Sequence, residues 1–254
     1  MALYLIGLGL CDGYDLSLRG LELLRDCDAI WLDSYTGIAA CTPDQLSELC
    51  GKPVLVADRA ALEEGSAGLL KAAARQKIAL IVPGDPLAAT THLSLVEAAR
   101  SAGIEIKIVH NASILTAVAE CGLQLYRFGR TISLPIPSEH FKPTSAYDML
   151  RTNLEASLHS LILLEARPEQ GQFVSIANAI DYLLAFETER RCGIFRPSSL
   201  VVGCARLGWP DSLIKAGAAA ALRELEFGRP PHCLIVPSKQ LHFAEREALG
   251  RFLI

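Results

Sequence analysis

The sequence predicts an α/β protein with two α/β domains, residues 1–110 and 111–254. Three observations support this class. Short apolar runs of strand length alternate with amphipathic helical stretches along the first half of the chain. The connections between them are short, which favours a parallel or mostly parallel sheet covered by helices. The chain has 254 residues, more than one domain usually holds, and past residue 110 the strands become fewer and the loops longer.

In the first half, strands are predicted where the chain is continuously apolar over a few residues, a pattern typical of strands buried on both faces. The predicted strands are residues 3–8, 29–32, 54–56, 78–82 and 104–109. Apolar residues at helical spacing predict the helices between them. The predicted helices are residues 16–27, 60–75 and 91–101.

The second half is expected to begin near residues 110–113 and to continue with a helical stretch at 111–120. The proline-rich segment 131–143 cannot form a central strand throughout, because proline lacks the amide donor that a sheet requires. A helix is predicted from residue 144 or 145 to about 158. Further strands are predicted at 160–164, 200–204 and 233–236, and further helices at 173–188 and 213–226.

The composition excludes several classes of protein. Hydrophobic residues make up 51% of the chain and the formal net charge is −4, which excludes intrinsic disorder and disfavours a globally basic nucleic-acid binder. The mean hydropathy of +0.30 is high. However, no apolar run approaches the ~18–20 residues of a membrane-spanning helix, and the N-terminus lacks the features of a signal peptide. Burial in a large core therefore explains the hydropathy better than contact with lipid does.

The eight cysteines are scattered, and none forms a C-x-x-C pair. Zinc sites need closely spaced ligands, and disulfide scaffolds concentrate many cysteines in a short chain. We therefore predict no metal site, and we expect reduced, mainly structural thiols in a cytoplasmic protein.

A glycine-rich turn, from Gly7 to Gly13, directly follows the first predicted strand. Glycines permit a tight turn and close approach of the backbone to a ligand. The turn is compatible with simple packing. It is also compatible with dinucleotide binding, with Asp33 after the second strand as the acidic partner, although the glycine spacing is one residue longer than that motif requires.

A second motif, Val82-Pro83-Gly84-Asp85-Pro86-Leu87, follows the strand at 78–82. In open α/β sheets, ligands bind outside the carboxyl ends of the strands, so Asp85 is a candidate hydrogen-bond acceptor for a ligand. The alternative is a turn in which Asp85 caps the next helix. His92 is expected to be a capping or surface residue rather than a ligand-binding one.

Two further positions are candidates with structural alternatives. Ser113 follows the strand at 104–109 and could simply begin a helix, and His232 opens a strand after two prolines and could simply face the sheet end. The sequence contains no H-E-x-x-H, G-x-S-x-G or P-loop motif, so zinc proteolysis, serine hydrolysis and P-loop phosphoryl transfer lack support.

Taken together and in order, several segments closely resemble the diphthine synthase family, in the tetrapyrrole-methylase-like class of S-adenosylmethionine-dependent methyltransferases. The segments are MALYLIGLGLCDGYDLSLRGLELLRDCDAIWLDSYT, VPGDPLAATTH, VHNASILTAVAECGLQLYRFGR, PTSAYD at 143–148 and PPHCLIVP. The resemblance covers nearly the whole chain, and the length is similar to that of the shorter, archaeal members. One departure is HNASI, where H-A-P-S-I is more usual.

The resemblance implies a fold of the tetrapyrrole methylase type and a homodimer, with S-adenosyl-L-methionine bound in an interdomain cofactor cleft and S-adenosyl-L-homocysteine as the product. The positions that match the family's donor-binding motifs are Leu10, Asp85, Ala88, Ser113, Ile114, Leu164, Ala205 and His232. No catalytic dyad is apparent, which is compatible with a protein that mainly aligns donor and acceptor. Arg206 and His92 are candidate cations for a substrate carboxylate, and Tyr35 is a candidate aromatic face for an ammonium group.

The implied reaction is successive methylation of the amino group of the 3-amino-3-carboxypropyl arm on a histidine of translation elongation factor 2, which yields diphthine in diphthamide biosynthesis. Neither a nucleic acid nor a membrane is an expected partner. One alternative is a corrin or porphyrin-precursor methyltransferase of the same class, which the missing G-x-G-P-G-D loop disfavours. Others are a dinucleotide-dependent oxidoreductase, and a binding module that uses the proline-rich segment 131–143.

Overall fold

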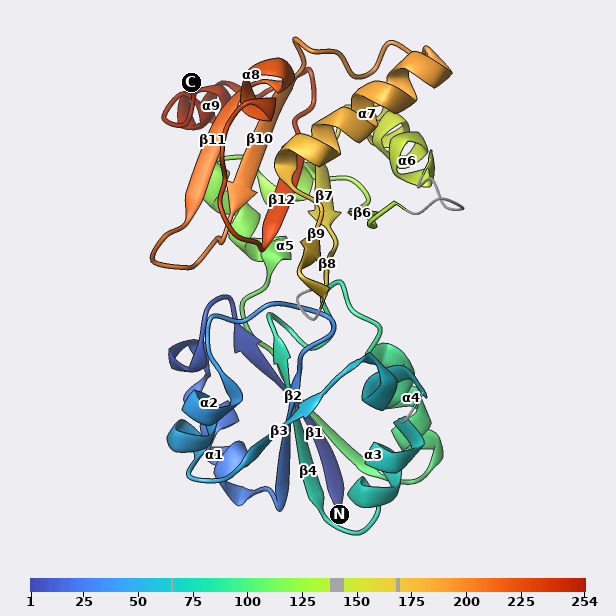
Figure 1. Cartoon of the computed structure of the whole chain (residues 1–254), viewed down its shortest axis with the longest axis vertical. Coiled ribbons are helices and arrows are strands. Elements are labelled where there is room, and N and C mark those ends of the chain that lie inside the picture. The colour runs from blue at the N-terminus through green and yellow to red at the C-terminus, as the bar shows by residue number, and fades with distance from the viewer. Residues whose placement is uncertain (65, 138–143, 168–169) are drawn as a thin grey trace. The chain divides into compact units, whose positions relative to one another are not determined.

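The computed structural model describes residues 1–64, 66–137, 144–167 and 170–254. The chain divides into two compact units, Met1–Ala117 and Val118–Ile254. We call them the N-terminal unit and the C-terminal unit and describe each by itself (Figure 1).

The N-terminal unit is built on a five-stranded sheet in the order β3-β2-β4-β1-β5, with every pairing parallel. The strands are β1 (Ala2–Gly9), β2 (Ala29–Asp33), β3 (Val54–Ala57), β4 (Lys77–Pro83) and β5 (Glu105–Val109). All five strands predicted in this half are confirmed to within two residues at each end. Because the strands are parallel, the loops that follow them emerge at one edge of the sheet.

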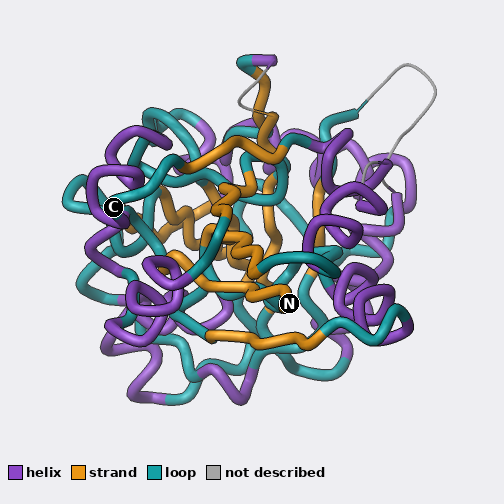
Figure 2. Tube along the Cα trace, turned by 90° about the horizontal axis from the view of Figure 1, so that it is seen from below, coloured by secondary structure: helices purple, strands orange, loops and turns teal. Residues whose placement is uncertain are grey.

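Helices cover both faces of this sheet, as Figures 1 and 2 show. They are α1 (Leu18–Asp26), α2 (Pro43–Cys50), α3 (Ser66–Ala73) and α4 (Leu93–Ser101), and the short α5 (Ile114–Ala117) follows β5. The helix α2 is not among the predicted helices, although Thr42 and Gln45 form a capping box at its start, a recognisable signal. The helix predicted at 60–75 is divided into a π-helical turn, Ala60–Glu64, and α3.

Successive side chains of β1 point to opposite faces of the sheet, which explains why this central strand is apolar throughout. Leu3 and Leu5 point to the face covered by α3 and α4, whereas Tyr4, Ile6 and Leu8 point to the face covered by α1 and α2. Both faces are therefore buried, and a polar residue on either side would lack a partner.

The C-terminal unit contains a mixed sheet in the order β11-β10-β12-β7-β6. The strands are β6 (Ile132–Leu134), β7 (Ser160–Leu164), β10 (Leu200–Ala205), β11 (Leu213–Ala218) and β12 (His232–Val236). The pair β6–β7 is parallel and the other pairs are antiparallel. A small hairpin, β8 (Ala166–Arg167) with β9 (Gln172–Phe173), follows β7. The described part of the proline-rich segment contributes the edge strand β6; residues 138–143 lie outside the described residues.

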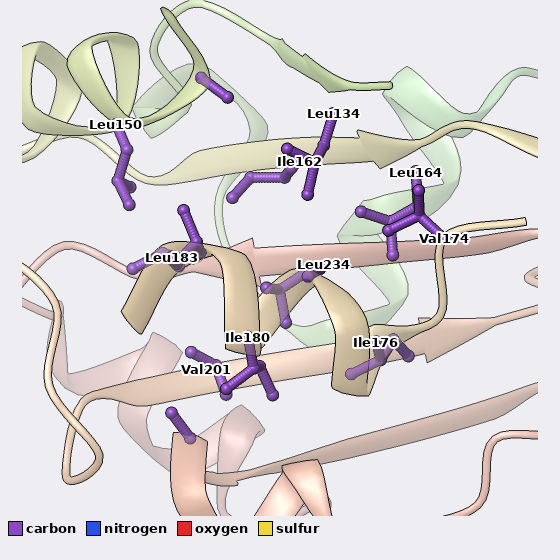
Figure 3. Packing of buried hydrophobic residues seen from close by; sticks show 14 of the residues in the cluster. Leu134, Leu150, Ile162, Leu164, Val174, Ile176, Ile180, Leu183, Val201 and Leu234 are labelled. Carbon is purple, nitrogen blue, oxygen red and sulfur yellow. The ribbon is translucent and has the colours of Figure 1, made fainter. Parts of the chain in front are cut away.

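One face of this sheet is covered by α6 (Thr144–Glu155), α7 (Ile176–Arg190) and α8 (Ala219–Arg223). Figure 3 shows Ile176, Ile180 and Leu183 of α7 lying over Val201 and Leu234 of the sheet. Their spacing is the helical period that predicted this helix, which begins three residues later than expected. Among the described residues, no helix has the length and apolar character needed to cross a bilayer.

The helix predicted at 213–226 is largely wrong. Leu213–Ala218 is the strand β11, paired antiparallel with β10, and only Ala219–Arg223 is helical. The run of alanines favours a helix locally, but pairing with β10 outweighs that preference over the first six residues. The outer edge of β11 is also occupied, because the amide of Ala216 donates to the Phe252 carbonyl at 2.8 Å and the amide of Ile254 donates to the Ala216 carbonyl at 3.1 Å.

A buried polar network holds the last helix, α9 (Phe243–Leu249), in the C-terminal unit. Glu245 Oε1 accepts from His159 Nε2 at 2.9 Å and from the amide of Gln124 at 3.1 Å. Glu245 Oε2 accepts from the amide of His242 at 2.9 Å and from Arg127. His159 Nδ1 in turn accepts from the amide of Ser238 at 2.9 Å. Both His159 nitrogens and both Glu245 oxygens are therefore used within the fold.

Candidate active site

The predicted donor-binding positions of the N-terminal unit lie at the carboxyl edge of its sheet. Leu10 follows β1, Asp85 and Ala88 follow β4, and Ser113 and Ile114 follow β5. These strands are neighbours in the order β4-β1-β5, so the three loops lie side by side. The N-terminal unit thus brings together all five positions that the motifs predicted in it.

Backbone hydrogen bonds join the first two loops. The amide of Gly9 donates to the Gly84 carbonyl at 3.2 Å, and the amide of Gly84 donates to the Gly9 carbonyl at 2.7 Å. Gly9 has φ +95°, and a Cβ there would overlap Asp15 Cβ. Glycine is therefore required at position 9 by both conformation and space.

Asp85 joins the second loop to the third. Its Oδ1 accepts from the amide of Leu87 at 2.9 Å, and its Oδ2 accepts from His110 Nδ1 at 2.8 Å and from the amide of Asn111 at 3.1 Å. Burial raises the pKa of the Asp85 carboxyl, but these hydrogen bonds more than offset it, so the pKa lies below its ordinary value. Asp85 does not cap the next helix, because α4 begins at Leu93.

Asn111 joins the third loop to the first. Its side-chain Nδ2 donates to the carbonyls of Gly7 and Asp15, each at 2.9 Å, and its Oδ1 accepts from the amide of Ala112 at 2.8 Å. This segment is where the sequence departs from the usual H-A-P-S-I. The hydrogen bonds of Asn111 thus give the loop a rigidity that does not depend on a proline.

Asp15 shapes the first loop from inside. Its Oδ2 accepts from the amides of Leu10 and Cys11, at 3.0 and 2.7 Å. This contact bends the chain just after β1 and fixes the backbone of Leu10, a predicted donor-binding residue. Sequence reasoning missed this role of Asp15, and the only signal was an aspartate five residues after Leu10 in GLGLCDGYD.

A buried acid–imidazole pair lies where β2 and the segment after β4 meet. His92 Nε2 is 3.2 Å from Asp33 Oδ2, and the two side chains are 3% and 0% exposed. Asp33 also accepts from Thr36 and from the amides of Tyr35 and Thr36. His92 is therefore neither a surface residue nor a side-chain cap of α4. Asp33, which the dinucleotide interpretation needed for a ribose, is fully engaged inside the fold.

The charge state of Asp33 follows from these contacts. Burial raises the pKa of its carboxyl, whereas the close imidazole of His92 and the hydrogen bonds from Thr36 and Tyr35 lower it by more, so the pKa lies below its ordinary value. Asp33 is thus a carboxylate at neutral pH, held next to an imidazole in a dry environment.

The predicted positions of the C-terminal unit also share one edge. Leu164 ends β7, Ala205 ends β10 and His232 begins β12. β12 lies between β10 and β7 and runs antiparallel to both, so Ala205 pairs with His232, and Cys233 pairs with Leu163. This unit therefore brings its three predicted positions together too.

His232 is buried, and among the residues that the structure describes neither ring nitrogen makes a hydrogen bond of good geometry, although backbone groups of Phe227, Gly228 and Arg229 lie close to the ring. The rings of Phe173 and Phe227 contact it edge-on, with centroids 5.5 and 6.3 Å away. Burial and the nearby positive charge of Arg206 lower the pKa of His232. A neutral imidazole of this kind at a sheet edge suits a polar ligand such as a nucleoside or an amino-acid group.

Arg206 and Tyr35, which are candidate substrate contacts, each interact with other residues of their own unit. Arg206 donates to the carbonyls of Phe227, Arg229 and Asp211 and lies 2.9 Å from the Asp211 carboxylate, so it joins two loops of the C-terminal unit. The ring of Tyr35 is covered on one face by Arg59, whose guanidinium carbon is 5.3 Å from the ring centre. These contacts give both residues a structural task.

Residues 2–223 match the family of tetrapyrrole (corrin/porphyrin) methylases. Because the match spans most of the chain, the chain belongs to this methylase family.

Similar proteins within that family carry a more specific name. The chain is 38% identical to diphthine methyl ester synthase from Aspergillus fumigatus over 267 residues, which cover 99% of this chain and 94% of the relative. It is also 38% identical to the enzyme of the same name from Schizosaccharomyces pombe, with the same coverage. Among solved structures, one titled diphthine synthase superposes with a TM-score of 0.91 at 32% identity, covering 100% of this chain and 96% of the other.

Proposed function

We propose that this chain is an S-adenosyl-L-methionine-dependent methyltransferase of diphthamide biosynthesis. It methylates the amino group of the 3-amino-3-carboxypropyl arm on a histidine of translation elongation factor 2. The observation that carries the proposal is the full-length similarity to diphthine methyl ester synthases, at 38% identity. The same relatives favour this function over a corrin or porphyrin-precursor methylase and over an oxidoreductase.

The residues present fit such a donor. In the C-terminal unit by itself, His232 has no well-formed hydrogen bond among the described residues, so its nitrogens are suited to a polar group of a ligand. The three joined loops of the N-terminal unit present the backbone of Leu10, Ala88 and Ser113 at the carboxyl edge of the sheet, a common ligand position. Bound there, the donor supplies a methyl group on a sulfonium, which is reactive without further activation. The role of the chain is then to hold the amine in line with that methyl group.

The extent of methylation is the next part of the proposal. Successive transfers to one nitrogen end at a trimethylammonium group. The relatives' names add a methyl ester, so this chain is also expected to transfer a methyl group to the carboxylate of the arm. A homodimer located in the cytoplasm, as the family resemblance implies, belongs to the same proposal.

Two measurements test the function. Thermal melts with S-adenosyl-L-methionine, with S-adenosyl-L-homocysteine and with NAD should show a raised midpoint for the first two only, because a ligand that binds the folded state stabilises it. Intact-mass measurement of elongation factor 2 carrying the unmethylated arm should then show successive methyl additions. Mild alkali should remove the ester methyl and leave the methyls on nitrogen. A melt shifted by NAD alone, or an unchanged mass, would exclude the proposal.

A further inference from the structure

The inference concerns the fate of a proton and rests on the proposed function. An amine of this kind is an ammonium at neutral pH, and an ammonium has no lone pair with which to attack a methyl group. Each methylation of the nitrogen up to trimethylammonium releases one proton. A group near the donor-binding loops that can accept this proton repeatedly would therefore raise the rate.

The tautomer of His92 is set by its two neighbours. Nε2 lies 3.2 Å from the Asp33 carboxylate, outside hydrogen-bond geometry, and the negative charge beside it favours the tautomer that carries the proton on Nε2. Nδ1 then has a free lone pair. It lies 2.5 Å from the hydroxyl oxygen of Thr90, so the Thr90 hydroxyl donates to Nδ1.

Thr90 connects this buried pair to the candidate site. It is half-buried, whereas His92 is buried, and it lies two residues beyond Ala88 in the loop after β4. Ala89 between them has φ +56°, a strained conformation for a residue with a side chain. Such strain persists where the surrounding structure enforces it, and it concentrates at functional sites. The Thr90 oxygen also accepts weakly from the amide of His92, at 3.4 Å, and retains acceptor capacity for a substrate.

We propose that Thr90, His92 and Asp33 form the proton acceptor of the methyltransferase, with the Thr90 hydroxyl contacting the substrate ammonium and His92 holding the proton. Thr90 and His92 are then catalytic residues. Asp33 is a positioning residue that fixes the tautomer and stabilises the imidazolium, in the manner of the aspartate in a serine-hydrolase triad.

The ammonium N–H bond breaks as Thr90 Oγ1 takes that proton, and Thr90 passes its own hydroxyl proton to His92 Nδ1. The hydroxyl is thereby regenerated, and one net proton has moved to the imidazole. The lone pair left on the substrate nitrogen forms the new bond to the methyl carbon as the carbon–sulfur bond breaks, and the sulfur keeps that electron pair. After the product leaves, the imidazolium returns its proton through the Thr90 hydroxyl, which passes a proton on to water.

Within the described parts of the chain, Asp33 is the ionisable side chain in contact with the His92 ring. Charged groups of the neighbouring segments make other contacts. Arg59, from the segment after β3, lies over Tyr35. On α4, Glu97 and Arg100 pair with each other at the surface, 2.6 Å apart.

The test compares initial rates of methyl transfer to the modified elongation factor from about pH 6 to about pH 9, a range that covers ordinary imidazole and amine titration. The variants are Thr90→Val, which removes the hydroxyl at constant shape, and His92→Gln. Thr91→Val is the matched control, and Thr90→Ser should restore the rate. At neutral pH, Thr90→Val and His92→Gln should each lose about 100-fold, the usual contribution of general acid–base catalysis.

Three results support the inference. The difference in rate between the wild type and each variant becomes smaller as the pH rises, because more of the amine is then deprotonated in solution. The double variant is no slower than the slower single variant, because residues that act as one unit are not additive. The thermal shift with S-adenosyl-L-methionine stays unchanged in Thr90→Val. A rate for Thr90→Val that equals that of Thr91→Val at every pH, or a loss that is constant with pH, would overturn the inference. If the wild type itself transfers no methyl group at any pH, the proposed function fails instead.

Discussion

The N-terminal unit buries Asp33 with His92, and the C-terminal unit buries Glu245 with His159. The two pairs differ at the other imidazole nitrogen. His159 Nδ1 accepts from the backbone amide of Ser238, which can donate but cannot accept, whereas His92 Nδ1 faces the hydroxyl of Thr90, which can do both. The hydrogen bonds that run from Glu245 through His159 therefore end at the Ser238 amide. Those that involve His92 can continue through the Thr90 hydroxyl to another group. The partner of the second imidazole nitrogen therefore decides the role of each pair: Glu245–His159 is suited to anchoring, and Asp33–His92 is suited to proton transfer.

The largest expected effect is on the anchoring pair. Glu245→Ala should lower the free energy of unfolding by about 3–5 kcal/mol, because it leaves Arg127 and His159 without their buried carboxylate partner. Chemical denaturation monitored by circular dichroism measures the change. Glu247→Ala, on the exposed face of the same helix, is the control and should change little. Equal stability of the two variants would show that the network does not anchor α9.

A smaller effect is expected where side chains join the loops of the N-terminal unit. Asn111→Ala removes both donations to the Gly7 and Asp15 carbonyls and should cost about 1–3 kcal/mol of stability. Because the loops then lose their fixed spacing, the affinity for S-adenosyl-L-methionine should fall by about tenfold, which corresponds to ~1.4 kcal/mol. Isothermal titration calorimetry measures this affinity. Unchanged affinity with reduced stability would limit Asn111 to a role in folding.

A second carboxylate of the C-terminal unit, that of Glu187, should affect how the stability of the fold changes in acid. Burial raises the pKa of Glu187, but hydrogen bonds from Tyr147 and from the amides of Phe195, Gly193 and Ile194 lower it to about 2. A depressed pKa stabilises the fold above the ordinary value of 4.5, and this contribution is lost as the pH falls toward 2.

Glu187→Gln should therefore cost about 1 kcal/mol near neutral pH, and the difference from the wild type should shrink below pH 4.5. Urea melts at a series of pH values measure it, with Glu189→Gln as the exposed control on the same helix. A difference that does not depend on pH would contradict the assignment.

The smallest effect is expected at the exposed thiol. Cys192→Ser should change stability by less than about 0.5 kcal/mol and leave methyl transfer intact. Burial raises the pKa of Cys11, Cys27 and Cys121 to about 11, which keeps those thiols protonated and unreactive. A methyl-transfer assay of the variant checks this. Abolished transfer would point to a thiol in the chemistry and against the Thr90–His92–Asp33 acceptor.

The sequence was most informative where a local pattern decides the structure. Apolar runs predicted every strand of the N-terminal sheet, and the motifs predicted positions that the fold brings to one edge in each unit. The sequence was least informative where contacts between residues far apart in the chain decide the structure. β11 is a strand because β10 pairs with it, despite an alanine-rich helical composition. Asp33 and His92 meet only because β2 and β4 are neighbours in the sheet, and neither residue carries a local signal of that pairing.

The backbone bonds between Ala216 and the segment Phe252–Ile254 have a practical consequence. An uncovered strand at the side of a sheet offers its amides and carbonyls to a strand of another molecule, and self-association can begin there. Phe252–Ile254 occupy these groups at Ala216 in β11. A variant without Phe252–Ile254 is therefore expected to precipitate more readily than the chain that contains these residues.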